Sequence, residues 1–238
     1  MPAEEGEESP RESIPEKFDG GNVIMHCVLH EDKERFAKVF DDAENPYYES
    51  ASVLLKQRSE VGKSPIEVAC MLGRADILKD IIKRGCDVNA ANGSGYCPIH
   101  FAAAWGHVKC LEALVESGAS VDCTTRHGEL AKEIAFRYDH NHCVYYLNWA
   151  AAKLALVAFI SHARELIADP EKLQGIKLTK EEKTTVLGSC SEKQEWLEST
   201  TDATADDFIA KKTELEKQID VILNKTISPA PTTENGKK

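Results

Sequence analysis

Hydrophobic residues in the middle of the chain follow a helical spacing, and the whole pattern recurs without a gap. The segment from Pro65 to Asn89 aligns with the segment from Pro98 to Asp122 at an offset of 33 residues. A third copy at the same offset is more divergent but still recognisable. A fixed period over three copies predicts a repeat architecture. The matched pairs are Pro65/Pro98, Ile66/Ile99, Ala69/Ala102, Gly73/Gly106, Leu78/Leu111, Ile81/Leu114, Gly85/Gly118 and Val88/Val121, then Gly95/Gly128, Ala102/Ala135, His107/His140, Leu111/Val144 and Leu114/Leu147.

Each copy predicts two short helices joined by a turn. Pro98 fits the first turn of a helix, where its missing N–H would have no partner anyway. Gly106 ends that helix because the cap requires a left-handed residue. Residues 107–116 then form a second helix with an apolar stripe, and Gly118 ends it. One such pair leaves its apolar face uncovered, so neighbouring copies must stack to bury it.

The opening of each copy resembles the ankyrin family, whose signature is T-P-L-H-x-A. The second copy reads Cys97-Pro98-Ile99-His100-Phe101-Ala102, and the first has Glu67 in the place of His100. The third, residues 130–135, lacks both Pro and His, as expected for a terminal repeat. Residues 23–40 match only in outline and are interpreted as a degenerate first repeat. The resemblance predicts an all-α ankyrin-repeat solenoid of three to four repeats over residues 21–149.

Two further helical blocks follow the repeats. Residues 150–168 are predicted to form a capping helix that closes the last repeat and ends at Asp169-Pro170. Residues 171–226 are predicted to form a small helical bundle that begins with the N-cap Thr179. The residues expected on its inner side are Val186, Leu187, Cys190, Trp196, Leu197, Phe208, Ile209, Leu215, Ile219 and Ile222.

This last block resembles the C-terminal helical lid of the seventy-kilodalton heat-shock chaperones. The order of residues that carries the resemblance includes Lys172-Leu173, Leu187, Cys190, Trp196-Leu197, Phe208 and Glu214-Leu215-Glu216. It departs from the lid at Val221, where proline is expected. No nucleotide-binding domain fits in the remaining chain, so chaperone ATPase activity does not carry over.

Acidic tail, repeats and lid-like bundle together resemble one family of ankyrin-repeat proteins. The resemblance implies an intracellular protein linked to cell division and proliferation. It directs attention to the cytoplasm, nucleus, cleavage furrow and midbody, and it leaves a cilium link open.

Charge and composition exclude several partners. A net charge of −11 over 238 residues argues against nucleic acid, which requires a clustered basic face. Residues 1–20 contain seven acids and three prolines, so they and the tail 227–238 are expected to be disordered. The eight cysteines show no CxxC pair and are interpreted as reduced intracellular thiols. The apolar run of residues 150–160 is interrupted by Lys153 and is about half a bilayer span, so no membrane insertion is expected.

Candidate catalytic and metal sites are weak. Gly93-Ser94-Gly95 lies in a turn between repeats, where glycine serves the backbone. Cys97 and His100 occupy repeat positions at which the ring orients the turn, and the His140–Cys143 cluster begins a helix that needs Cys143 buried. Cys110, close to His107 in sequence, aligns with Ile77 and is therefore interpreted as a core thiol. We expect no catalytic, cofactor or metal residues.

A protein-binding surface is the sharper prediction. In ankyrin repeats the turn tips and the outer side of the first helix vary without damage to the stack. Phe101 and Trp105 lie four residues apart and project from one side of a helix, although packing against adjacent repeats would explain them equally well. We expect a non-catalytic scaffold that binds protein on its concave side; a cochaperone-like adaptor and a structural subunit of a microtubule-based assembly (axoneme or midbody) are the alternatives. The predicted binding residues are Lys63, Met71, Tyr96, Phe101, Trp105, Glu129, Arg137 and Tyr138.

Overall fold

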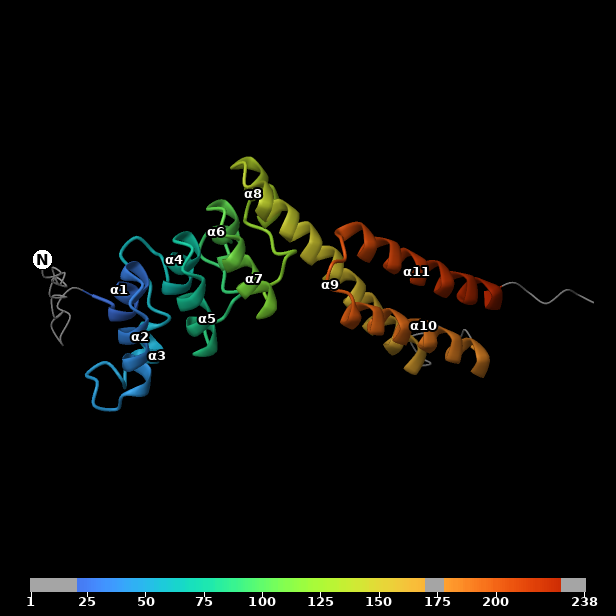
Figure 1. Cartoon of the computed structure of the whole chain (residues 1–238), viewed down its shortest axis with the longest axis horizontal. Helices are drawn as coiled ribbons and strands as arrows, with labels where there is room; N and C mark the ends of the chain where they lie inside the picture. The colour runs from blue at the N-terminus through green and yellow to red at the C-terminus, as the bar shows by residue number, and fades with distance from the viewer. Residues whose placement is uncertain (1–20, 170–177, 228–238) are drawn as a thin grey trace, which may run out of the picture. The chain divides into compact units, whose positions relative to one another are not determined.

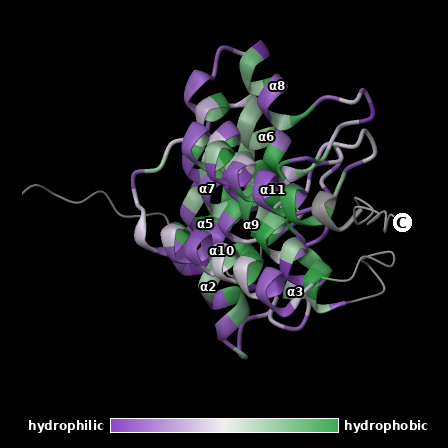
Figure 2. Cartoon of the chain, turned by 90° about the vertical axis from the view of Figure 1, so that its right-hand side faces the viewer, coloured by the Kyte–Doolittle hydropathy of each residue, from purple (hydrophilic) through white to green (hydrophobic). Residues whose placement is uncertain are grey.

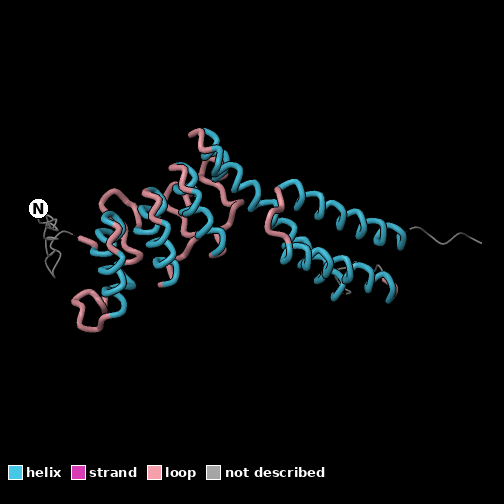
Figure 3. The backbone as a smooth tube through the Cα atoms, viewed as in Figure 1, coloured by secondary structure: helices cyan, strands magenta, loops and turns pink. Residues whose placement is uncertain are grey.

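The computed structural model describes residues 21–169 and 178–227, and over these residues the chain is all-α. Helices form eleven elements, and no strand occurs within the described ranges (Figures 1 and 3). Two compact units divide between Cys143 and Val144. The predicted tail 1–20, the start of the predicted bundle at 171–177 and residues 228–238 lie outside the described residues. The predicted all-α fold is confirmed.

Helix pairs in series make up the first unit. A longer connection, which contains the short helix α3 (Ala51–Leu54), joins the first pair to the second. Among the first helices of successive pairs, α1 packs against α4, α4 against α6, and α6 against α8. The pairs are α1 (Val23–His30) with α2 (Lys33–Asp41), α4 (Pro65–Met71) with α5 (Ala75–Lys83), α6 (Pro98–Ala104) with α7 (Val108–Glu116), and α8 (Ala131–Arg137) with the start of α9 (Asn141–Ala168).

The same capping device starts the first helix of three repeats. Pro65 and Pro98 are the first residues of α4 and α6, at equivalent places as the period requires. The side chain three residues after the N-cap accepts a hydrogen bond from the N-cap backbone N–H, which satisfies a donor that the helix leaves unpaired. These bonds run from Ser64 to Glu67 (3.2 Å), from Cys97 to His100 (3.0 Å) and from Leu130 to Glu133 (2.8 Å).

Histidine rings hydrogen-bond two of the repeats to the repeat before them. The Nε2 of His107 donates to the backbone carbonyl of Met71 at 3.1 Å, and that of His140 donates to the carbonyl of Ala104 at 3.0 Å. Both acceptors lie at the C-terminal end of the preceding first helix, where carbonyls lack a helical partner. The predicted role of Gly106 is confirmed, because its φ is +77°.

Ion pairs join the first repeat to the second across the longer connection. Glu31 pairs with Arg74 and Lys33 with Asp76, while Asp41 and Arg84 approach to 2.8 Å. All three pairs bring together residues 43 positions apart. Because the pairs are exposed, each contributes little on its own. Together they link the degenerate first repeat to the second at one constant register of 43 residues.

The second unit is a bundle of three helices, and this changes the predicted role of residues 150–168. They belong to the 28-residue helix α9, which starts inside the last repeat rather than at residue 150. Their buried side shares one hydrophobic core with α10 (Lys180–Ser199) and α11 (Ala205–Ile227). The separate capping helix was therefore a wrong prediction. The periodicity identified a helix, but it does not say which neighbour the apolar side meets.

The core of the bundle also differs in detail from the predicted one. Phe208 is 3% exposed and Ile209 is 53% exposed, so only one of two adjacent apolar residues faces inward. Leu187, predicted to lie inside, is 42% exposed, whereas its neighbour Val186 is buried. Successive residues of a helix are about 100° apart, which forces this choice. Figure 2 shows hydrophobic and hydrophilic residues sharing the same helices.

Helix α9 is long and apolar enough to cross a membrane by length and composition alone. Its mean hydropathy reaches 1.5 over 18 residues, 28% of them buried. The expectation of no membrane insertion rested on a shorter run, because the sequence pattern alone did not show how far the helix extends. A core helix passes the same test, and α9 contributes Leu156, Ile160, Ala163 and Ile167 to the bundle core.

Candidate protein-binding face

The ends of the first helices carry a row of exposed side chains in the same register. Each member immediately precedes the left-handed residue that ends its helix, namely Glu31, Gly73, Gly106 or Asp139. We name these four positions the C-cap row. Its members are His30, Leu72, Trp105 and Tyr138.

The C-cap row is exposed at every position. Leu72 is 42% exposed, Trp105 55% and Tyr138 55%, and His30 is exposed as well. Single exposed apolar residues are common on protein surfaces, but a row of them in register indicates an interaction site. Trp and Tyr are also the residues most enriched where binding energy is concentrated.

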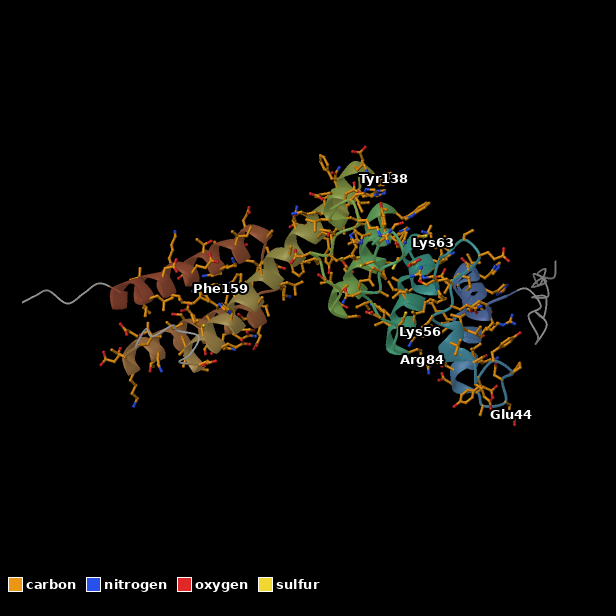
Figure 4. All side chains as sticks on the ribbon, turned by 180° about the vertical axis from the view of Figure 1, so that it is seen from behind. Glu44, Lys56, Lys63, Arg84, Tyr138 and Phe159 are labelled. Atoms are coloured by element: carbon orange, nitrogen blue, oxygen red, sulfur yellow. The ribbon has the colours of Figure 1, made fainter. Side chains whose placement is uncertain are left out.

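A second row lies at the other end of the same helices, one residue before each N-cap. We name it the turn row. Its members Lys63, Tyr96 and Glu129 are all half-buried. Figure 4 shows Lys63 and Tyr138 along one long edge of the repeats, while Lys56 and Arg84 lie along the opposite one. The turn row and the C-cap row together bound the candidate face.

Phe101 lies between the two rows and is packed by its own chain. Its side chain is only 7% exposed. The ammonium of Lys63 lies over the ring at 4.2 Å from its centroid, and the ring of Tyr96 lies 5.7 Å away. The alternative of packing between repeats therefore describes Phe101, whereas Trp105 is the exposed member of the predicted pair. Phe101 can support the face from beneath but offers little surface to a partner.

Of the other predicted residues, Glu129, Arg137 and Tyr138 lie together at the last repeat. Arg137 forms an ion pair with Glu129 and places its guanidinium 5.4 Å from the ring centroid of Tyr138. This pair raises the pKa of Arg137 through its hydrogen bond to Glu129. Met71 is half-buried and contributes its carbonyl to the His107 bond. The chain as a whole is strongly acidic, whereas on this face Lys63 is cationic and Glu129 and Arg137 neutralise each other.

The structure adds two residues that were not predicted for this face. Leu72 stands one repeat before Trp105, and His30 occupies the same place in the degenerate first repeat. The offset of 33 residues would have found Leu72. The register of His30 could not be read from the sequence, because the longer connection changes the offset there.

Several thiols of the repeats are buried and have raised pKa values. Burial raises the pKa of the thiols of Cys27, Cys110 and Cys123 to about 12. A thiol is nucleophilic only as the thiolate, so these groups are weak nucleophiles at neutral pH. Sulfur atoms of Cys97 and Cys123 and a ring nitrogen of His100 lie within 4.8 Å of one another, a proximity that spacing in the sequence did not indicate.

His100 is a structural clamp. Its Nδ1 accepts the backbone N–H of Cys97 at 3.0 Å, so its Nε2 carries the proton and donates to the carbonyl of Cys123 at 3.1 Å. Protonation at Nδ1 would place a second N–H opposite the backbone N–H of Cys97, so that two donors would face each other. Burial lowers the pKa of His100, although its hydrogen bonds to the backbone of Cys123 and Cys97 act in the opposite direction.

This clamp predicts a pH dependence of stability. Below about pH 6.5 the unfolded histidine takes up a proton that the folded ring resists, so the free energy of unfolding falls until the lower folded pKa is passed. Above about pH 6.5 the contribution of His100 to the free energy of unfolding is constant. Urea unfolding between pH 7.5 and pH 5 measures the slope. His100→Gln keeps one acceptor and one donor but does not titrate, and we expect it to show a shallower slope; equal slopes would contradict the prediction.

Comparison with known proteins supports the assignment of ankyrin repeats. The family described as "Ankyrin repeats (3 copies)" matches residues 39–125 and 66–156. "Ankyrin repeat domain-containing protein 45" of Homo sapiens is 41% identical over 215 residues, which cover 90% of this chain and 80% of that protein. The chain belongs to the ankyrin repeat domain-containing protein 45 family.

Other members of the ankyrin repeat domain-containing protein 45 family show the same likeness. The protein of that name from Mus musculus is 45% identical over 90% of this chain and 86% of its own length. The Danio rerio protein is 37% identical over 69% of this chain and 58% of its own length. Ankyrin repeats indicate a scaffold for protein–protein interaction, and proteins of this kind are generally non-catalytic.

Proposed function

We propose that this chain is a scaffold that binds an extended segment of a protein partner along the C-cap row, on the concave side of the repeats. The observation that carries the proposal is the register of exposed Leu72, Trp105 and Tyr138 on consecutive repeats. Trp105 stands in the middle of the row, where a buried contact excludes water best. On the same face, the ammonium of Lys63 and the ring of Tyr96 pack against Phe101.

The spacing of the row suggests the form of the partner. Packed helices lie about 8–10 Å apart, so consecutive members of the row are separated by roughly that distance. An extended chain in the polyproline II conformation advances about 3.1 Å per residue with about three residues per turn. A partner segment in this conformation with an apolar side chain at about every third residue would therefore present one to each repeat.

Trp105→Ala tests the proposal. We expect partner binding to weaken roughly 30-fold or more, as for a central aromatic anchor, with less than about 1 kcal/mol lost in stability because the ring is mostly exposed. The measurement is quantitative capture from cell extract with the full chain, followed by affinity measurement with the partner recovered.

The matched control is Tyr48→Ala. Tyr48 is 44% exposed and belongs to the connection after α2 rather than to either row. We expect this variant to retain every partner that the wild-type chain captures. Equal capture by Trp105→Ala and wild type would contradict the proposed face, even if other parts of the chain bind proteins.

The proposed setting is cell division and proliferation, in the cytoplasm and nucleus and at the cleavage furrow and midbody. Support for this setting comes from the family resemblance alone. Proximity labelling in dividing and in ciliated cells tests it. Enrichment of cytokinesis proteins would support it, whereas chaperones would favour the cochaperone-like adaptor, and axonemal proteins the microtubule-based subunit in a cilium.

A further inference from the structure

Cys97 and Cys123 form a thiol pair that the proposed function does not use. Their Sγ atoms lie within 4.8 Å of each other, although 26 positions separate them in the chain. Cys97 is the N-cap of α6 and is 5% exposed. Cys123 follows α7 in the turn before the next repeat and is half-buried, so reagents can reach it first.

The backbone around the pair is held in place by His100. One ring nitrogen accepts the N–H of Cys97 at 3.0 Å, and the other donates to the carbonyl of Cys123 at 3.1 Å. A single imidazole therefore ties the two cysteine backbones to each other. The same bonds make the ring a poor metal ligand, because coordination through either nitrogen would break one of them.

The sulfurs are less constrained than the ring. Cys97 Sγ donates weakly to the carbonyl of Asn89 at 3.5 Å, and Cys123 Sγ donates to that of Ser120 at 3.1 Å. Thiols are weak donors, so these bonds are easily given up. To reach the S–S bond length of about 2 Å the two atoms must approach by less than about 3 Å.

We propose that Cys97 and Cys123 are a redox-modification site that closes to an intramolecular disulfide with a low-molecular-weight disulfide such as glutathione disulfide. The Cys123 thiolate attacks one sulfur of glutathione disulfide, forms a mixed disulfide and releases one glutathione thiolate, which takes up the proton lost from Cys123. The Cys97 thiolate then attacks Cys123 Sγ and releases the second glutathione in the same way. Two protein thiols are oxidised and one glutathione disulfide is reduced. This proposal does not depend on the binding function.

Burial of the pair sets the rate of closure and its pH dependence. It raises the pKa of Cys123 to about 12 and also raises that of Cys97. The thiolate fraction at neutral pH is therefore small. It grows about tenfold for each unit by which the pH rises, as long as the pH stays below the pKa. Closure should be slow at pH 7 and about tenfold faster at pH 8.

Peptide mapping of the full chain tests the proposal. Trypsin cleaves after Arg84, Lys109 and Arg126, so Cys97 and Cys123 fall in separate peptides, residues 85–109 and 110–126. After incubation of the reduced protein with glutathione disulfide, we expect the two peptides to be joined and to separate again on reduction. The closed loop should also raise Tm by roughly 5–10 °C relative to the reduced chain.

Four variants identify the bond, because each peptide contains a second cysteine. Cys97→Ser and Cys123→Ser should abolish the joined species, whereas Cys86→Ser and Cys110→Ala should retain it. Serine is suited to position 97 because Ser64 occupies the equivalent N-cap in the preceding repeat. Peptides that stay separate in the oxidised wild type, with glutathione on Cys123 and Cys97 free, would overturn the proposal. So would a joined species that persists in Cys97→Ser.

Discussion

Gly106→Ala is expected to lower the free energy of unfolding of the repeats by about 3 kcal/mol. A left-handed residue that is not glycine costs about 1–2 kcal/mol, and Gly106 has a φ of +77°. The added Cβ would also lie 2.7 Å from Nδ1 of His140. The ring would have to move away and would lose its bond to the Ala104 carbonyl, which adds about 1 kcal/mol. Urea unfolding followed by circular dichroism measures the loss.

Two other positions separate the cost of the left-handed backbone from the cost of displacing the histidine ring. Gly118 has a φ of +87° with nothing within 4 Å of its Cβ position, so Gly118→Ala should cost only the strain of about 1–2 kcal/mol. Asp139 occupies the place of Gly106 one repeat later with a φ of 58°, and Asp139→Gly should be neutral or slightly stabilising. Equal losses in Gly106→Ala and Gly118→Ala would show that the histidine contact contributes nothing.

A double-mutant cycle gives an independent check. If the ring of His140 is the obstacle, Gly106→Ala should cost less in a His140→Ala background, with a coupling of about 1 kcal/mol. Gly73 meets His107 in the same way, with a Cβ position 2.6 Å from Nδ1. Gly73→Ala should therefore reproduce the loss seen for Gly106→Ala.

The contact between Gly106 and His140 shows how far the sequence alone could go. The period placed both residues at positions that recur in the repeat; Pro fixes φ, and Gly permits the left-handed conformation, whatever residues surround them. Helix starts and ends in the repeats were therefore predictable. Which side chain of the next repeat lies over the glycine depends on how repeats stack, and no local propensity encodes that.

The position of the candidate face could be predicted from the sequence, but not which of its side chains are buried. Phe101 and Trp105 follow the same helical spacing, yet one is covered and the other exposed. The difference comes from Lys63 and Tyr96, which cover Phe101 from the two neighbouring turns. The ring of Trp105, by contrast, sits at the end of its helix. Periodicity gives the direction of a side chain, whereas its burial depends on neighbours far apart in the chain.

The second unit shows the same limit for a whole helix. Residues 150–168 were recognised as helical because apolar residues recur at the right spacing. Their partner was misjudged because that spacing is the same whether the helix covers a repeat or enters a bundle. Trp149, which donates to the carbonyl of Ala203 at 2.8 Å, reveals the true neighbour.

Phe208→Ala is expected to unfold the bundle selectively. Phe208 is 3% exposed and meets Trp149 of α9 and Trp196 of α10 edge-to-face, with centroids 5.7 and 5.5 Å away. One ring on α11 therefore connects all three helices. Truncation of a buried phenylalanine costs about 3–5 kcal/mol, and a bundle of this size has little stability to spare.

Hydrogen exchange read residue by residue measures the effect of Phe208→Ala. Amides of α10 and α11 should lose most of their protection, while those of α6 and α7 serve as the reference in the same sample. Ile209→Ala is the matched control, because Ile209 is the next residue of the same helix and is 53% exposed. It should change protection in the bundle by less than about 1 kcal/mol. Comparable losses in both variants would mean that the aromatic contacts of Phe208 do not hold the three helices together.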